Sequence, residues 1–293
     1  MKTGVGYRTI IYSVLVIVLA MSWGCSKQSV DTKSTDSSSE PTITDAERAL
    51  AMLQVQNSMS KHMYYHINGN HCEEMEDIWV SENGPYGKTA TWSGASIEEG
   101  IALIKENYCT KNIETKKKAL TAISKVSDVK DVSENLGAGH EFSLHMQTTP
   151  IIEIAGDGKT AKGVWYTPGF IKKPVISADG KVSESGQWMF ERYAVDFAKE
   201  DGKWKIWHFQ NIGDTSPPWG AGEKSDQTQF RDSALDKAGA QAKAGTQEAQ
   251  SSSRTYSRIN PNPVPETWSP TTVPKMYPKF PEPYYTFSET FSY

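Results

Sequence analysis

The hydrophobic pattern of this chain changes its period once, close to residue 140. Before that point apolar residues recur with helical spacing, whereas four later segments alternate between apolar and polar residues, as half-buried strands do. The four alternating segments cover 141–154, 159–170, 188–199 and 203–211. Gly156-Asp157-Gly158 and Asp201-Gly202 lie between members of this set and are typical of hairpin turns. Helices followed by an antiparallel meander predict an α+β fold, in which the helices pack on one face of a curved sheet.

The helical part opens with a capping signal. Thr44 followed three residues later by Glu47 is a capping box, and the apolar spacing after it predicts a helix over 45–66. Asn70 then predicts the start of a short second helix that reaches Trp79. The remaining elements that the pattern predicts are a strand over 89–92, an amphipathic helix over 96–108 and a helical segment over 116–125.

Residues 1–25 have the layout of a secretory leader. Lys2 and Arg8 precede an apolar run over 10–21, which is shorter than the roughly 20 residues of a membrane-spanning helix. The run leads into Ser22-Trp23-Gly24-Cys25, which resembles a bacterial lipobox, in which the cysteine is acylated. We therefore expect an exported protein that is anchored to the membrane by a lipid on Cys25. Simple cleavage and an uncleaved anchor are the alternatives.

Composition divides the rest of the chain into three parts. A Ser/Thr-rich tether over 26–43 precedes one domain over 44–215, and 216–293 is a low-complexity linker followed by a tail rich in proline and aromatic residues. Eight of the fifteen prolines lie between Pro261 and Pro283, which favours an extended course over helix or sheet. Because the tail also carries apolar aromatic area, we expect it to pack on its own domain or on a neighbouring subunit.

The net charge bears on the class of binding partner, and the number of cysteines bears on whether a disulfide forms. The net charge is −4 with both signs interspersed and no basic stripe, so no nucleic-acid partner is expected. If Cys25 is acylated, Cys72 and Cys109 remain as a pair in an oxidising compartment. They form either a disulfide or two separate buried thiols, because the sequence does not give the distance between them.

Three strings in the strand region resemble the SnoaL-like branch of the NTF2-like superfamily, which includes scytalone dehydratases and bile acid 7α-dehydratases. They are His145-Met146-Gln147-Thr148-Thr149-Pro150, Ala161-Lys162-Gly163-Val164-Trp165-Tyr166 and Asp201-Gly202-Lys203-Trp204. The resemblance covers 44–214. It implies a cone-like antiparallel sheet that curls around the helices and encloses an apolar pocket, a chemistry without a cofactor, and a homo-oligomer.

The resemblance also implies roles for individual residues. His145 matches the family's catalytic histidine, which acts as a general base or acid. The acidic partner on the next strand falls on Gly169, and that of the first helix falls near Asn68, so both partners are missing. The family's helix tyrosine falls on His62, Met63 or Tyr64, depending on a slip of one residue.

These considerations predict a set of site residues. The catalytic candidates are His145, Tyr64 and Asp196, and the candidates for substrate binding are Tyr65, Asn68, Trp165 and Tyr166. Asp196 either orients His208 on the adjacent strand or forms a cross-strand pair with Arg192 or Lys205. For His145 the alternative is that it lies on the plain solvent face of its strand. No metal site is expected, since His62 and His66 lie one helical turn apart without a third ligand at the proper spacing.

The function expected from the sequence is that of a cofactor-independent lyase or isomerase. Its pocket histidine would move a proton on an apolar steroid-, polyketide- or aromatic-like molecule. A non-catalytic lipoprotein that binds a small molecule is the first alternative, and a dimeric assembly module is the second.

Overall fold

A computed structural model describes residues 42–125, 142–179, 181–216, 218–219, 255–260, 270–271 and 276–289. The predicted leader, with Cys25, and most of the tether lie outside the described residues. Within these ranges, no helix is both long enough and apolar enough to cross a membrane.

The predicted first helix is confirmed as α1 (Asp45–Asn68), and it starts at the predicted capping box. Thr44 and Glu47 bond each other's backbone N–H groups, and Gly69 ends the helix in the left-handed conformation, with φ 70°. The other helices are α2 (His71–Asp77), α3 (Ile101–Lys105), the π-helical turn η1 (Glu106–Lys111), α4 (Asn112–Ile123) and the short 3-10 helix η2 (Phe287–Glu289).

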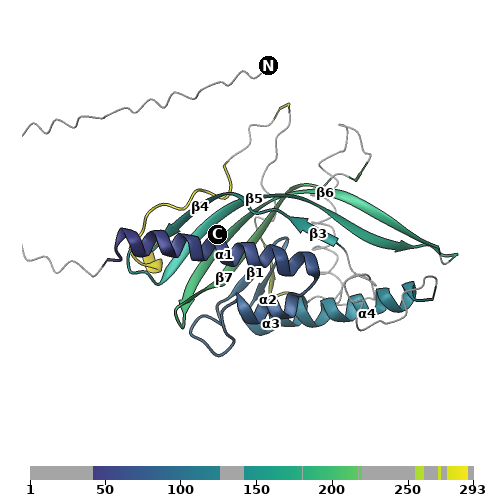
Figure 1. Cartoon of the computed structure of the whole chain (residues 1–293), viewed down its shortest axis with the longest axis horizontal. Coiled ribbons are helices and arrows are strands. Elements are labelled where there is room, and N and C mark those ends of the chain that lie inside the picture. The colour runs from purple at the N-terminus through teal and green to yellow at the C-terminus, as the bar shows by residue number, and fades with distance from the viewer. Residues whose placement is uncertain are drawn as a thin grey trace, which may run out of the picture. The chain divides into compact units, whose positions relative to one another are not determined.

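The strands form one open sheet that is antiparallel except where β1 runs parallel to β7. The order is β3-β5-β6-β7-β1-β2-β8. Strand β4 lies outside this order and also pairs with β5. Figure 1 shows the long strands β5 and β6 crossing the whole domain, with α3 and α4 in a row along the opposite side of the view. The bounds are β1 (Thr91–Ser93), β2 (Ser96–Glu99), β3 (Phe142–His145), β4 (Thr148–Ile154), β5 (Thr160–Ile176), β6 (Val182–Glu200), β7 (Lys203–Thr215) and β8 (Arg258–Ile259).

The helix predicted over 96–108 is wrong in its first part. Residues 96–99 form strand β2, which folds back on β1, and the helix begins only at Ile101. Gly100 separates the two elements with φ at 90°, a conformation that few residues other than glycine adopt. The spacing of Ile97, Ile101 and Ile104 resembled one helical face across this break.

The two faces of the sheet have different coverings. Tyr193, Val195 and Phe197 of β6 point inward and belong to the same core cluster as Val55 and Met59 of α1. This face, toward α1, is called the inner face below, and the opposite one the outer face. The alternation along the strands is therefore what places a side chain in the site or outside it.

The described part of the tail packs on the outer face of its own domain. Gly156 and Asp157 donate backbone hydrogen bonds to the carbonyl groups of Tyr284 and Tyr285. The ring of Phe287 lies 4.6 Å from that of Trp207, measured between centroids. These residues thus agree with the expectation that the tail packs on its own domain.

Candidate functional site

His145 points into the domain, so the alternative that it lies on a solvent face is wrong. Its side of β3 is buried, with 4% of His145 and 1% of Ser143 exposed, whereas Phe142 and Met146 on the opposite side are 44% and 45% exposed. The strand therefore turns its polar residues inward and its apolar residues outward, the reverse of an ordinary half-buried strand. A protein that buries an imidazole in this way must supply it with polar partners.

Two partners hold the imidazole of His145. Its Nδ1 lies 3.0 Å from Oε2 of Glu191, which is itself buried on β6, and its Nε2 lies 2.6 Å from the hydroxyl oxygen of Ser143. The contact with Glu191 is at ion-pair distance without the geometry of a hydrogen bond, whereas Ser143 forms a hydrogen bond with Nε2. A carboxylate at this distance can stabilise the positive charge of an imidazole that takes up a proton.

Tyr193 completes this side of the site. Its hydroxyl donates to Oε2 of Glu191 over 3.3 Å. Burial, reinforced by the nearby negative charges of Glu191 and Glu74, raises the pKa of Tyr193 well above its usual value. The phenol therefore stays protonated and remains a hydrogen-bond donor at all ordinary pH values.

The acidic partner that the family resemblance places at residue 169 comes instead from another strand. Gly169 is the register partner of His145, and a Cβ atom there would fall on the backbone carbonyl of Leu144. No side chain fits at this close approach of β3 to β5. Glu191 of β6 supplies the carboxylate, so the expectation that the partner is missing is corrected.

A second histidine–carboxylate pair reaches the site from the helices. Nδ1 of His62 lies 2.7 Å from Oε1 of Glu74, and both side chains are buried. Glu74 also accepts hydrogen bonds from Nε1 of Trp79 and from the hydroxyl of Tyr108, over 3.3 and 3.0 Å. Of the three positions that could replace the family's helix tyrosine, His62 is the one that faces inward, whereas Tyr64 is 65% exposed.

The rings of His62, His66, His71 and His145, called the histidine cluster below, lie side by side. The centroid of His66 is 5.5, 5.0 and 5.2 Å from those of His62, His71 and His145, respectively. Where the resemblance implies an apolar pocket, the described residues thus place polar and aromatic side chains. Among those residues, no group of three or more His, Cys, Asp or Glu side chains is arranged to hold a metal ion.

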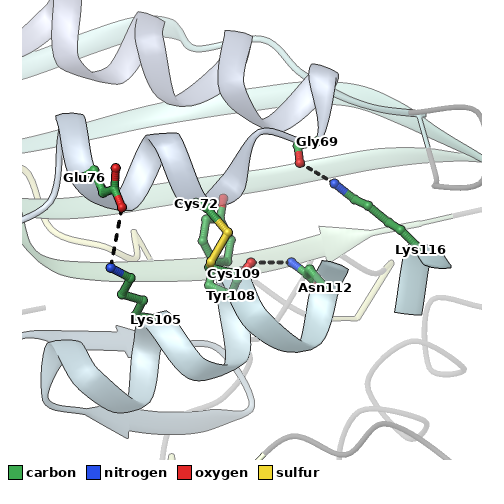
Figure 2. Close-up of a disulfide and its surroundings, with 8 residues drawn as sticks. All are labelled: Gly69, Cys72, Glu76, Lys105, Tyr108, Cys109, Asn112 and Lys116. Carbon is green, nitrogen blue, oxygen red and sulfur yellow. Dashed lines mark hydrogen bonds and ion pairs between the residues drawn. A yellow bond between two sulfur atoms is a disulfide. The ribbon is translucent and has the colours of Figure 1, made fainter. Parts of the chain in front are cut away.

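A disulfide ties together the two helical segments beside the cluster. Cys72 of α2 and Cys109 of η1 are bonded, which decides between the two alternatives left by the sequence. Figure 2 shows the bridge with Tyr108 next to it. The residues that precede the two cysteines, His71 and Tyr108, contact each other with ring centroids 4.5 Å apart. The disulfide therefore fixes the helices that carry Glu74 and Tyr108.

The predicted catalytic residue Tyr64 and the predicted substrate-binding residues lie away from His145. The exposed Tyr64, Asn68 and Tyr166 point outward, since a helix turns Tyr64 away from His62 and strand alternation puts Tyr166 on the outer face. Tyr65 donates its hydroxyl to Oδ2 of Asp77 over 3.1 Å. Trp165 does point inward, but its ring lies in the core and its Nε1 donates to Gln56 over 3.0 Å.

Asp196 does orient His208, but on the outer face of the sheet. Its carboxylate oxygens lie 2.7 Å from Nζ of Lys162 and 2.8 Å from Nδ1 of His208. Lys162 lies under the ring of Phe287, 4.6 Å from its centroid. Because Asp196 alternates with the inward-facing Val195 and Phe197, the strand separates this network from His145. Of the cross-strand alternatives, Arg192 pairs with Asp214, and Lys205 donates to the backbone carbonyl of Asp77.

A cavity of about 360 Å³ lies among residues of α2, α3 and the turn between β6 and β7, and its lining includes none of the four histidines of the cluster. Met75, Trp79 and Ile101 contribute its apolar lining, and Lys105 and Glu200 are among its charged lining residues. Trp79 also donates its Nε1 to Glu74, so a single side chain borders both the cavity and the second histidine–carboxylate pair. No sequence pattern pointed to Glu74 or Glu191, because a carboxylate on a helix or strand is ordinarily a solvated residue.

Several solved structures resemble this chain at low identity. A hexachlorocyclohexane dehydrochlorinase (LinA) of type 2 is 13% identical with a TM-score of 0.39, and the match covers 62% of this chain and 98% of the other. A protein assigned as a scytalone dehydratase from Novosphingobium aromaticivorans DSM 12444 is 14% identical with a TM-score of 0.38, over 61% and 100% of the two chains.

Most of the domain matches one protein family. No curated protein matches the chain. Residues 47–210, which are more than half of the 293, match the SnoaL-like domain family. This range contains both histidine–carboxylate pairs, His62 with Glu74 and His145 with Glu191. The chain therefore belongs to the family of SnoaL-like domains, within the NTF2-like fold.

Proposed function

We propose that this domain is a cofactor-independent lyase or isomerase that moves a proton on an apolar, aromatic- or steroid-like small molecule. The observation that carries the proposal is the burial of His145 between the carboxylate of Glu191 and the hydroxyl of Ser143. A histidine at the surface is solvated by water and does not need such partners. A general base needs both a fixed orientation and a counter-charge.

In the proposed step, an acidic C–H group of the substrate displaces the Ser143 hydroxyl from Nε2 of His145. The imidazole takes the proton, and the carboxylate of Glu191 stabilises the imidazolium that results. The electron pair left on the substrate is delocalised into an adjacent carbonyl group, and Tyr193 is positioned to keep Glu191 in place. Return of the proton to another carbon is an isomerisation, and loss of a leaving group is an elimination.

Exchange of α-protons in heavy water tests this step without knowledge of the natural substrate. The probe is benzylacetone, an aromatic ketone, and the readout is deuterium incorporation measured by NMR. The wild-type protein should accelerate the exchange, and His145→Gln should lose at least about 100-fold of that acceleration. Ser143→Ala should retain the exchange, since it only removes the resting partner of Nε2. Absence of any acceleration by the wild-type protein contradicts the proposal.

The same experiment separates catalysis from plain binding, which is the alternative class. A binding protein would retain the ketone without exchanging its protons. The absence of acidic partners for His145 was one argument for the binding alternative, and Glu191 beside His145 weakens it.

We also propose that the protein is exported and lipidated at Cys25. The disulfide between Cys72 and Cys109 supports export, because such bonds persist in oxidising compartments. Metabolic labelling with a palmitate analogue should mark the wild-type protein and leave Cys25→Ala unlabelled. Equal labelling of the two proteins would rule out this acylation site.

A homo-oligomer is proposed as well, formed through the outer face near β3. Exposed apolar side chains gather there, and extended patches of this kind are typical of contact sites. They are Phe142, Met146, Trp188, Phe190 and Trp219. Light scattering should give a dimer for the wild-type protein and a monomer for Trp188→Glu, and a wild-type monomer would refute the proposal.

A further inference from the structure

Three consecutive residues of the π-helical turn η1 are buried and reach three different parts of the molecule. They are Asn107, Tyr108 and Cys109. Cys109 forms the disulfide to α2 (Figure 2), and the hydroxyl of Tyr108 donates to Oε2 of Glu74 over 3.0 Å. Asn107 binds the tail at Thr255. Turns of π-helix are rare in proteins and occur frequently at functional sites.

The side-chain amide of Asn107 binds the backbone of Thr255 as a neighbouring strand would. Its Nδ2 donates to the Thr255 carbonyl over 2.6 Å, and its Oδ1 accepts the Thr255 N–H over 3.2 Å. Nζ of Lys111, one turn further along η1, donates to the same Oδ1 over 3.0 Å and to the Thr255 hydroxyl over 3.5 Å. Without the tail, the fully buried amide of Asn107 would lose both bonds to backbone, which is costly for a buried polar group. The amide is therefore complementary to the main chain of an extended peptide.

The edge of β2 continues this recognition along the tail. Ser257 donates its backbone N–H to the carbonyl of Ile97 over 2.8 Å, and its hydroxyl accepts the N–H of Glu99 over 3.0 Å. The side chain of Asn260 donates to the carbonyl of Gly94 over 2.9 Å. Addition of an extended peptide to a sheet edge is a common mode of recognition, in which main-chain bonds give affinity and side-chain contacts give specificity.

Little of the docked segment 255–260 is itself buried. Only Asn260 of the six residues is buried, and none of the six belongs to the hydrophobic core of the domain. The segment is held by hydrogen bonds at a sheet edge. Such an attachment can open locally while the rest of the domain stays folded.

We propose that the edge of β2 and the amide of Asn107 form a binding site for an extended peptide of the pattern Thr-x-Ser-x-x-Asn, and that residues 255–260 are its tethered ligand. The docked peptide holds η1 in place and thereby positions Tyr108, the next residue along the turn. The Tyr108 hydroxyl oxygen lies 2.9 Å from Nδ1 of His66, so the peptide site is connected to the histidine cluster through one side chain. This site lies outside the proposed proton transfer by His145, and it can be tested without a substrate.

Ser257→Pro in the full chain should open the site, because proline has no N–H to donate to Ile97. The probe is a fluorescein-labelled peptide with the sequence of residues 254–261, and fluorescence anisotropy measures its binding. It should bind Ser257→Pro at least about tenfold more tightly than the wild type, in which the tethered segment competes at a high effective concentration. The same peptide with proline in place of its serine should not bind.

Asn107→Asp tests the amide in the Ser257→Pro background. It keeps the size of the side chain but replaces the donor that faces the Thr255 carbonyl, 2.6 Å away, by an acceptor. Peptide binding should weaken at least about tenfold. Glu106→Gln changes an exposed carboxylate of the same turn and is the matched control, which should leave the affinity unchanged.

The 15N chemical shift of Nδ1 of His66 reports on the position of Tyr108. In histidine-labelled protein, Tyr108→Phe gives the value without the hydroxyl. Ser257→Pro should move the signal toward that value, and saturation with the unlabelled peptide should return it to the wild-type value. A general folding defect of Ser257→Pro would not be reversed by the peptide.

The outcomes separate the peptide site from its effect on Tyr108. A peptide that does not bind Ser257→Pro, or that binds equally with and without Asn107→Asp, overturns the peptide site. Binding without any change at His66 overturns the positioning of Tyr108. Neither result bears on His145, whose role is tested by the exchange of benzylacetone protons.

Discussion

Gly169 lies directly opposite His145 in the register of β3 and β5, at a point where the backbone of β3 occupies the space of a side chain. We expect Gly169→Ala to destabilise the domain by about 3 kcal/mol, because its Cβ would overlap the carbonyl group of Leu144. Chemical denaturation measures the effect. Gly94→Ala is the control, since the nearest atom to its Cβ is at an ordinary 3.5 Å, and it should change stability by less than about 1 kcal/mol. Equal effects at the two positions would contradict the close approach.

The sequence could predict the framework of this fold. The capping box fixed the start of α1, and the alternation over 159–211 predicted the strands that became β5, β6 and β7. Local signals sufficed there because each element is stabilised by its own periodic burial. They failed at Ile97, where a strand and a helix follow each other and share one apolar spacing.

The candidate site was less accessible from the sequence. His145 could be found by its motif, but Glu191 and Glu74 come from elements 46 and 71 residues away from it, by the differences of their numbers. A contact between distant segments depends on strand register and helix orientation, which no local pattern encodes. Tyr64 and Tyr166 were misplaced for the same reason, because a shift of one or two residues turns a side chain from the inner to the outer side.

The disulfide should contribute strongly to stability. It closes a loop with a sequence separation of 37 residues. In the loop-entropy account such a bridge contributes about 4 kcal/mol. The double variant Cys72→Ser/Cys109→Ser should therefore unfold at a lower urea concentration than the oxidised wild type.

A reducing agent provides the control for this prediction. It should destabilise the wild type by a similar amount and leave the double variant unaffected. If reduction changed the stability of both proteins equally, the bridge would not be the cause.

Asp77 should make the stability of the domain depend on pH in the acid range. Burial alone would raise its pKa, but the hydrogen bonds from Lys61 and Tyr65 outweigh burial and hold the pKa below its usual value. A carboxyl group with a lowered folded-state pKa stabilises the protein above its unfolded pKa of about 3.9, and the contribution is lost as the pH falls through the folded value.

Asp77→Asn should accordingly cost about 0.5–1 kcal/mol at about pH 7, a modest effect because the Lys61 side chain is largely exposed, and almost nothing at about pH 2. Urea denaturation at both pH values measures this difference. A double-mutant cycle with Lys61→Met isolates the pair. An Asp77→Asn effect that does not shrink in acid would refute the assignment.

The tail should stabilise the outer face through Phe287, which contacts Trp207 and covers Lys162. We expect Phe287→Ala to cost about 1–3 kcal/mol, which is less than for a fully buried phenylalanine. Thermal unfolding gives the value. Phe280→Ala, which changes a mostly exposed phenylalanine of the same segment, should stay within about 0.5 kcal/mol of the wild type. Identical losses for the two variants would show that the tail does not act through Phe287.

The proposed proton transfer depends most on the carboxylate of Glu191, which lies beside the buried base. Glu191→Gln keeps the size of the side chain and removes its charge from Nδ1 of His145, which it approaches to 3.0 Å. Glu184→Gln changes a carboxylate of the same strand that pairs with Lys172 at the surface, and it serves as the control. The decisive measurement is the rate of deuterium uptake by benzylacetone for the wild type and both variants. We predict a loss of at least about 100-fold for Glu191→Gln and no change for Glu184→Gln; wild-type rates in both variants would contradict the account.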